Sequence, residues 1–218
     1  ERPFVIELTG PPKAGKTTTK EKLQQLIRRN GFLIEAPEEG AEAVTWAKRL
    51  DPEYNLQTGE YALSATRELC YGSKHKSFHV VILDRAVYDV VFRMEYNRMR
   101  GKITDARQRA IEDYFLLDVN RAMFDCHIIL VADPHVALSR EKAHALSKKD
   151  VETMNANALV EITDAHQRVW QRLDCANDPK LLWRDTSNES PEETSAAVLA
   201  FALDRLDARL KAAAAATK

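Results

Sequence analysis

The stretch that decides the fold is Gly10-Pro11-Pro12-Lys13-Ala14-Gly15-Lys16-Thr17. It matches the Walker A pattern, in which four residues separate one glycine from Gly-Lys-Thr. Glycines let the backbone curl so that successive N–H groups point at a phosphate, and Lys16 reaches the outer phosphates of ATP. The Thr17 hydroxyl can ligate Mg²⁺, while Thr18 lies in the helical segment whose positive N-terminal end faces the same anion. The stretch predicts that residues 10–18 bind ATP and Mg²⁺.

Short apolar runs before and after this loop have the composition of buried strands. They are rich in β-branched and aromatic residues and too short to be helices. They occupy residues 4–6, 32–34, 80–83, 128–131 and, less clearly, 181–183. Segments with helical spacing lie between them, and strands that alternate with helices indicate a parallel sheet with helices on both faces. Ligands of such sheets bind at the carboxyl ends of the strands.

Helix boundaries support this alternation. The helix after the loop ends at Asn30-Gly31, a common helix stop. Asp133-Pro134 supplies an N-cap and a first-turn proline directly after the fourth apolar run. A capping box before the last helix is formed by Ser190-Pro191-Glu192-Glu193.

Composition and charge indicate one globular domain over residues 1–218. Hydrophobic residues make up 44% and charged residues 30%, and no Gly/Ser-rich linker divides the chain. The net charge of -1 gives no reason to expect nucleic acid or a membrane as partner, and the apolar run 196–203 is too short to span a bilayer. The chain opens with Glu1 and without a signal-peptide pattern, so we expect residue 1 to be a domain boundary.

The cysteines and histidines show no metal-ligand spacing. Cys70, Cys126 and Cys175 are far apart in the sequence, and the histidines are scattered. We therefore expect reduced thiols in a cytoplasmic protein and no zinc site. We expect a solvated helix face, and not a nucleic-acid surface, at the basic residues Arg93, Arg98, Arg100 and Lys102.

The third apolar run ends in a carboxylate and a guanidinium, Asp84-Arg85. Asp84 should emerge beside the phosphate loop, where it can hold Mg²⁺ through water or accept a proton from the attacking group. Arg85 is suited to bidentate contact with phosphate. A surface ion pair is the alternative, and the nearby phosphate loop favours the functional role.

At this point the sequence resembles the thymidylate kinase and deoxynucleoside kinase families of P-loop kinases. The resemblance rests on the phosphate loop, on Leu83-Asp84-Arg85, and on the segment 128–140, an apolar run followed by a proline-led helix. It continues into residues 185–187, which match the segment whose following loop borders the adenine. It implies the three-layer P-loop NTPase fold of the α/β class, with a five-stranded parallel sheet in the order 2-3-1-4-5 and helices on both faces.

The resemblance also implies roles for single residues. Arg67, at the end of the helical segment 61–67, matches the families' substrate-binding arginine. Arg140 matches the arginine that opens a phosphate-covering lid, which we expect at residues 140–152. Further positive charge on this lid would come from Lys142, Lys148 and Lys149.

Some positions depart from the families' pattern. Pro12 stands where thymidylate kinases usually have an aspartate, and Lys13 stands where some carry an arginine that reaches the transferring phosphoryl group. Lys13 can do part of that work as a point charge. The families' Glu-Pro pair is not reproduced cleanly in residues 35–40, where Glu35 or Glu38 could act as a general base and a solvated acidic loop is the alternative.

Aromatic residues are candidates for the acceptor site. Trp46 and Tyr54 fall where the families place groups that stack on the acceptor base, although core packing is the commoner role. Tyr88 begins a helical stripe of aromatic residues that is typical of a core, and it is the member nearest the site. The expected substrate-binding set is Arg67, Arg85, Glu38, Trp46 and Tyr88.

Phosphoryl transfer needs charge neutralisation and in-line placement more than covalent help. The expected catalytic residues are Lys13, Lys16 and Arg140, which neutralise the transferring group, and Asp84, which positions Mg²⁺ or takes the proton. The small-molecule acceptor decides what else is needed.

A nucleoside monophosphate would attack with its own phosphate and need arginines, and Arg67 makes this the first interpretation. A nucleoside or another small alcohol would need a carboxylate base such as Glu35 or Glu38. The non-enzyme alternative is a regulatory P-loop module that binds nucleotide without transfer. The sequence leaves a homodimer open.

Overall fold

The structure is a computed structural model that describes residues 2–49, 51–73, 76–144 and 155–216. At its centre lies a parallel sheet of five strands in the order β2-β3-β1-β4-β5. This confirms the predicted architecture and strand order. The strands are β1 (Phe4–Thr9), β2 (Ile34–Glu35), β3 (Val80–Asp84), β4 (Cys126–Val131) and β5 (Leu181–Asp185).

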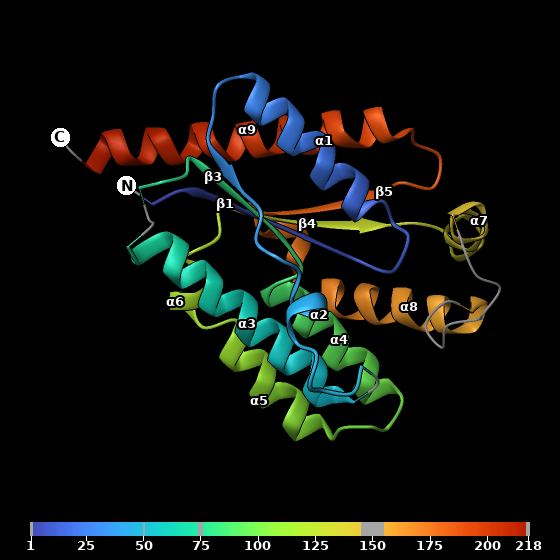
Figure 1. The fold of residues 1–218 in the computed structure, drawn as a ribbon. Coiled ribbons are helices and arrows are strands. Elements are labelled where there is room, and N and C mark those ends of the chain that lie inside the picture. Colours follow the sequence, from blue (N-terminus) through green and yellow to red (C-terminus); the bar gives the residue numbers. More distant parts are fainter. Residues whose placement is uncertain (1, 50, 74–75, 145–154, 217–218) are drawn as a thin grey trace.

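Helices cover both faces of the sheet, which makes three layers (Figure 1). Helices α1 and α9 pack on one face, and α3, α4, α5 and α8 lie on the other. The helices are α1 (Lys16–Arg29), α2 (Gly40–Ala43), α3 (Pro52–Tyr71), α4 (Val87–Met99), α5 (Asp105–Phe115), α6 (Asp118–Arg121), α7 (Pro134–His144), α8 (Ala156–Arg172), the 3₁₀ turn η1 (Cys175–Asn177) and α9 (Pro191–Ala216).

The alternation of side chains along β1 divides the core into two. Ile6 and Leu8 pack toward α1 and α9, whereas Val5 packs toward α3 and α4. Glu7 and Thr9 share the face of Val5 and are fully buried, although both are polar. Two polar residues in an otherwise apolar layer require hydrogen-bond partners, and both find them at the start of α4.

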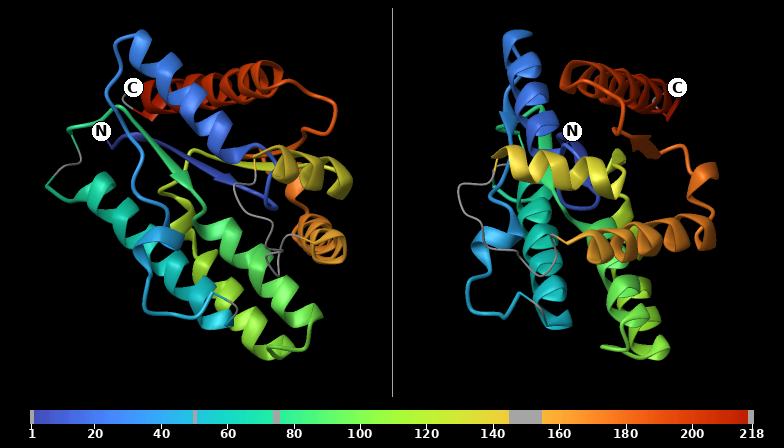
Figure 2. Two further views of the ribbon diagram at one scale, coloured as in Figure 1. Left: turned by 45° about the vertical axis from the view of Figure 1, so that its right-hand side comes forward. Right: turned by 90° about the vertical axis from the view of Figure 1, so that its right-hand side faces the viewer.

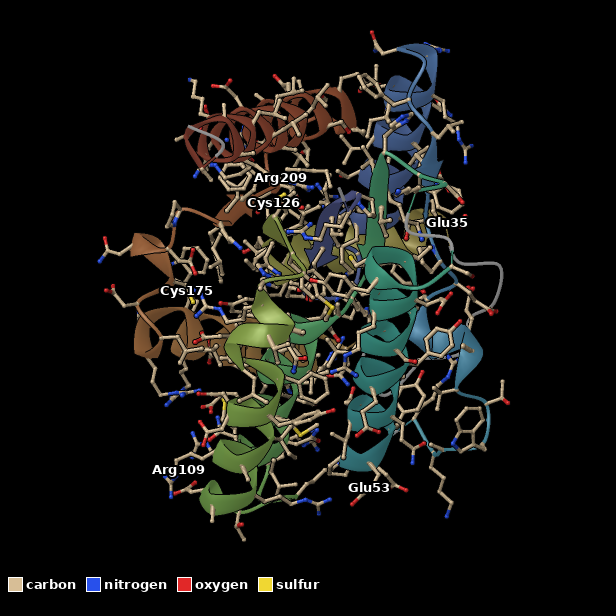
Figure 3. The ribbon with its side chains drawn as sticks, turned by 90° about the vertical axis from the view of Figure 1, so that its left-hand side faces the viewer. Glu35, Glu53, Arg109, Cys126, Cys175 and Arg209 are labelled. Atoms are coloured by element: carbon tan, nitrogen blue, oxygen red, sulfur yellow. The ribbon has the colours of Figure 1, made fainter. Side chains whose placement is uncertain are left out.

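The second strand differs from its prediction. It was expected at residues 32–34 and is found at Ile34–Glu35, with Phe32 and Leu33 49% and 58% exposed. The reason is that β2 is an edge strand with β3 as its one neighbour in the sheet. Its apolar residues outside the short paired segment therefore face solvent. Glu35 lies at this outer edge (Figure 3).

Other expectations from the sequence can be compared with the structure. The capping box is confirmed, since Ser190 N–H donates to Glu193 and Glu193 N–H donates to the Ser190 hydroxyl. The described cysteines are free and buried, and Cys126 and Cys175 lie in separate parts of the protein (Figure 3). Within the described ranges, no helix is long and apolar enough to cross a membrane.

The carboxyl ends of the strands point to one edge of the sheet, on the right in Figure 1 and toward the viewer in the right panel of Figure 2. The phosphate loop follows β1 at this edge, the Asp84-Arg85 turn follows β3, and α7 follows β4. The predicted chemistry is therefore collected in one place, as expected for a parallel sheet.

Candidate active site

The phosphate loop leaves β1 at Gly10, where only glycine fits. Its φ is +136°, and a Cβ at this position would lie 1.9 Å from the carbonyl oxygen of Leu130 on β4. The loop returns at Gly15, with φ +94°, directly before α1 begins at Lys16. This geometry aims the N–H groups of the first turn of α1 into the space that the loop encloses, and their positive ends favour an anion there.

The Lys16 ammonium lies inside this loop. Its Nζ donates to the carbonyl oxygens of Gly10 at 2.9 Å and Pro11 at 2.7 Å. Burial, reinforced by the positive charge of Arg85, lowers the pKa of Lys16 to about 7, against the pull of Asp84 and Asp89. An anionic ligand beside Lys16 would raise this lowered pKa again, because the ligand's negative charge stabilises the protonated lysine.

A cavity of ≈ 660 Å³ opens in front of the loop. The loop residues Thr17 and Thr18 line one part of it, and Asp84 and Arg85 line another. Its far end is formed by Thr186, Glu189, Pro191 and Thr194, which follow β5. The predicted adenine-bordering segment thus does reach the cavity, through Thr186.

Asp84 and Thr17 together suit Mg²⁺. Asp84 is 5% exposed, and its Oδ1 has no hydrogen-bond partner among the described residues, while its Oδ2 lies 3.5 Å from Lys20 Nζ. A buried carboxylate oxygen without a partner is a ready ligand for a hard cation. The described part of the chain holds no cluster of three His, Cys, Asp or Glu residues for a metal. Mg²⁺ commonly needs only one or two protein oxygens beside substrate phosphates and water.

Arg85 and Glu39 meet at the edge of the cavity. Arg85 Nε lies 3.1 Å from Glu39 Oε1 and 3.9 Å from Asp89 Oδ1. Arg85 has φ +69°, an uncommon value for a residue with a side chain, and its N–H donates to the Leu8 carbonyl. Burial raises the pKa of Glu39, and Arg85 opposes that rise in part.

The packing of α2 against α3 places Glu39. Glu39 is the N-cap position of α2, and the next residue, Gly40, touches α3 so closely that a Cβ would lie 2.7 Å from the Thr58 carbonyl oxygen. Any larger residue at this position would push α2 and Glu39 away from Arg85. The neighbouring residues in the sequence do not predict that Gly40 contacts Thr58, which lies 18 residues further along the chain.

A second, narrow cleft of ≈ 10 Å³ lies beyond the Glu39–Arg85 pair. Glu39 and Arg85 are the two residues that line both this side cleft and the main cavity. Its other walls come from the starts of α2, α3 and α4, with Tyr54, Asn55, Thr58, Asp89 and Val90 among them.

Asp89, which lines the side cleft, is a candidate site residue that the sequence reasoning missed, and Arg93 is its buried partner. Asp89 is buried; its Oδ1 accepts a hydrogen bond from the Thr9 hydroxyl at 2.9 Å, and its Oδ2 lies 3.8 Å from Arg93 Nε. Arg93 is 7% exposed, so the expected solvated basic face does not include it. Desolvation lowers the pKa of Arg93, and among the described residues its guanidinium makes no hydrogen bond. The i, i+4, i+8 spacing from Arg85 was the available signal.

Arg140 and Lys13 lie at the cavity but contact protein groups. Arg140 donates to the Thr186 carbonyl at 2.6 Å, to the Thr186 hydroxyl at 3.0 Å and to the Lys13 carbonyl at 3.2 Å. Lys13 Nζ pairs with Glu141 of α7 at 2.6 Å. These contacts tie α7 and the loop after β5 to the phosphate loop. Lys148, Lys149 and most of the expected lid lie outside the described residues.

Arg67 does not fit its predicted place on the acceptor side. It donates to Asn120 of α6 at 2.9 Å and lines neither cavity. Thr58 marks the part of α3 that reaches the side cleft, and nine residues of helix separate it from Arg67, about 13 Å. The start of α3 does line the side cleft, but Arg67 lies too far along this helix, toward the amino-terminal edge of the sheet.

Three other predicted substrate-binding residues also lie outside the cavities. Glu38 is exposed, and its neighbour Glu39 takes the position beside Arg85. Trp46 is 72% exposed. Tyr88 is 3% exposed and packs in the core against His127, with the ring centroids 4.6 Å apart, and burial raises the pKa of its phenol.

Comparison with known proteins identifies the fold. No protein-family model matches the chain, and no curated protein matches it. A deoxyadenosine kinase from M. mycoides, solved with dCMP and a flexible dCDP bound, is 16% identical with a TM-score of 0.59, covering 94% of this chain and 100% of its own. A thymidylate kinase from Candida albicans is 12% identical with a TM-score of 0.61, covering 91% and 90%. The chain therefore has the fold of these P-loop kinases, as the sequence resemblance implied.

Proposed function

We propose that the protein is an ATP-dependent kinase that phosphorylates a hydroxyl group of a nucleoside-like acceptor, with Glu39 as general base. One observation carries this proposal: the carboxylate of Glu39, paired with Arg85, stands between the phosphate-binding cavity and the side cleft. A hydroxyl acceptor in the cleft would meet the γ-phosphate at this point. A carboxylate whose pKa is raised by burial is suited to take the hydroxyl proton.

The reaction would proceed by direct transfer. The acceptor oxygen bonds to the γ-phosphorus as the bond from that phosphorus to the ADP oxygen breaks, and the hydroxyl proton passes to Glu39. Lys16 and the N-terminal amides of α1 would stabilise charge on the phosphates. Mg²⁺, held by Thr17 and Asp84, would neutralise charge on the outer phosphates. Arg85 would keep Glu39 oriented and ionised until the proton arrives.

The side cleft requires movement before an acceptor can enter. At ≈ 10 Å³ it holds no more than a water molecule, so α2 and the start of α3 would move away from α4 when the acceptor binds. The cleft walls offer Tyr54 for stacking and Asn55 and Thr58 for hydrogen bonds. The resemblance of fold to nucleoside and nucleotide kinases supports an acceptor of this class.

A nucleoside monophosphate is the second candidate acceptor, and Arg93 favours it. Its guanidinium lies beyond Asp89 from Arg85 and makes no hydrogen bond within the described structure. A phosphate that displaced the Asp89 carboxylate from between Arg85 and Arg93 would satisfy donors of both. The displacement of Arg67 weakens this reading, because it was the residue that first suggested a phosphate on the acceptor.

The deciding experiment measures ADP release with ATP, Mg²⁺ and a panel of nucleosides and nucleoside monophosphates. We expect nucleosides to accelerate release, and Glu39→Gln to lower that rate roughly a hundredfold or more. Glu38→Gln is the matched control, because it removes the exposed neighbouring carboxylate. Acceleration by monophosphates alone, with Glu39→Gln fully active, would favour the second candidate. ATP binding without acceptor-dependent release would favour a regulatory P-loop module.

A further inference from the structure

Glu7 is a buried carboxylate that the proposed mechanism does not use. It stands on β1, three residues before Gly10, and is 0% exposed. In the sheet it lies between Leu83 of β3 and His127 of β4. An ionisable residue in the centre of a parallel sheet needs partners for each carboxylate oxygen, and Glu7 has them.

One oxygen of Glu7 holds the first turn of α4. Glu7 Oε1 accepts hydrogen bonds from the backbone N–H groups of Ala86 at 2.8 Å, Tyr88 at 3.1 Å and Asp89 at 3.2 Å. Ala86 is the N-cap position of α4, and its side chain cannot cap the helix. A carboxylate from a different strand therefore satisfies amides that helices usually satisfy locally, and its charge suits the helix N-terminus.

The other oxygen is held by a histidine. Glu7 Oε2 lies 2.7 Å from His127 Nδ1, within hydrogen-bond distance. The His127 ring packs against two aromatic rings, with centroids 4.6 Å from Tyr88 and 5.0 Å from Phe124. The carboxylate cannot rotate away from the α4 amides without losing this second contact.

Arg85 lies next to the first turn of α4, which Glu7 holds. Arg85 directly precedes Ala86 and has φ +69°, a conformation that a residue with a side chain keeps only when its surroundings impose it. The constraints on either side are the Arg85 N–H bond to Leu8 and the Ala86 N–H bond to Glu7. We propose that Glu7 is a positioning residue, whose carboxylate holds the start of α4 and thereby aims Arg85 and Asp89 at the acceptor side of the site.

The functional half of this inference rests on the proposed kinase activity, and its test separates the two. Glu7→Asp keeps the charge but withdraws the carboxylate by one methylene, about 1.5 Å. We expect the acceptor's kcat/KM to fall roughly ten- to a hundredfold, the effect of displacing a site residue by about 1 Å. The half-saturating ATP concentration should change less than about threefold, because Lys16 is held by carbonyl oxygens of the loop itself, those of Gly10 and Pro11. Glu7→Gln keeps an oxygen that can accept from the α4 amides, so its kcat/KM for the acceptor should stay within about threefold of the wild-type value.

Hydrogen exchange supplies a readout that needs no acceptor. Amides of residues 86–89 should exchange at least about tenfold faster in Glu7→Asp than in wild type, while those of β4 stay protected. The matched control is Glu112→Asp, which shortens the side chain of another buried glutamate. Glu112 lies on α5 and accepts two hydrogen bonds from Arg172 of α8. It should lower the melting temperature without changing exchange at residues 86–89 or the acceptor's kcat/KM.

Each outcome decides the inference. If Glu7→Asp does not fold, His127→Phe is measured instead, and it should raise the acceptor's KM several-fold with ATP half-saturation unchanged. Unchanged exchange and kinetics in the folded variant would overturn the positioning role. So would a rise in the half-saturating ATP concentration as large as the fall in the acceptor's kcat/KM. If no acceptor accelerates ADP release by the wild-type protein, the proposed function fails, and exchange at residues 86–89 still tests whether Glu7 holds the turn.

Discussion

Lys16 should make the affinity for ATP depend on pH. In the free protein its ammonium is buried against the carbonyl oxygens of Gly10 and Pro11, and its pKa is about 7. Next to bound phosphates the protonated form is favoured, so the pKa rises on binding. Above pH 7 the free protein has lost this proton and must take it up to bind ATP. Affinity should therefore fall as pH rises.

The size of the effect follows from the pKa of about 7. At pH 8 about one free molecule in eleven carries the Lys16 proton, so the ATP dissociation constant should be roughly tenfold larger than its low-pH value. At pH 9 the factor is roughly a hundred, which corresponds to about 1.4 kcal/mol of binding free energy per pH unit. The last ionisation of a phosphate ester lies near pH 6, so the charge of ATP itself is nearly constant over this range.

Titration calorimetry at pH 7, 8 and 9 tests this prediction. Each titration is repeated in two buffers with different ionisation enthalpies, which gives the number of protons taken up. We expect close to one proton per ATP at pH 8 and above. Lys16→Arg is the control, because arginine stays protonated and should show neither proton uptake nor the fall in affinity. A constant affinity with no proton uptake in the wild type would refute the lowered pKa of Lys16.

Three further substitutions test the rest of the site. Asp84→Asn should lower turnover on the order of a hundredfold while calorimetry finds ATP affinity retained, because the loop amides still hold the phosphates; an unchanged rate would leave Asp84 as a structural residue only. Gly10→Ala would bring a Cβ to 1.9 Å from the Leu130 carbonyl oxygen, so thermal unfolding and ATP titration should both show large losses, and a normal melting temperature would contradict the loop geometry. Arg67→Ala should leave the acceptor's KM within about twofold and cost at most about 1 kcal/mol of stability through the lost bond to Asn120; a large rise in KM would return Arg67 to the acceptor site.

Features carried by adjacent residues could be predicted from the sequence. The phosphate loop is contiguous, and its chemistry follows from the spacing of Gly10, Gly15 and Lys16. The Asp84-Arg85 pair was predictable for the same reason, since a buried parallel strand delivers the residue at its carboxyl end to the site edge. Together with the family resemblance, these signals led to the observed fold and strand order.

Tertiary structure alone decided which carboxylate lines both the main cavity and the side cleft. Glu35, Glu38 and Glu39 lie within five residues of one another, and no local pattern separates them. The contact of Gly40 with Thr58 turns Glu39 toward Arg85 and leaves Glu38 in solvent. A loop has no fixed periodicity, so the direction of each side chain depends on what the loop packs against.

The positions and contacts of Arg67, Glu7 and Arg93 also depend on how distant segments pack, and so could not be predicted from the sequence. Helical spacing predicts which face of α3 carries Arg67, but the distance from the sheet edge depends on where the helix begins. Glu7 lies just beyond the apolar run predicted at residues 4–6, and its partners on α4 and β4 are 79 to 120 residues away in the chain. The sequence predicted Arg93 on a solvated basic face, whereas α4 packs against α3, α5 and α8 and buries this side chain. Spacing along the chain determines local geometry, whereas contacts between distant segments arise only when the layers pack.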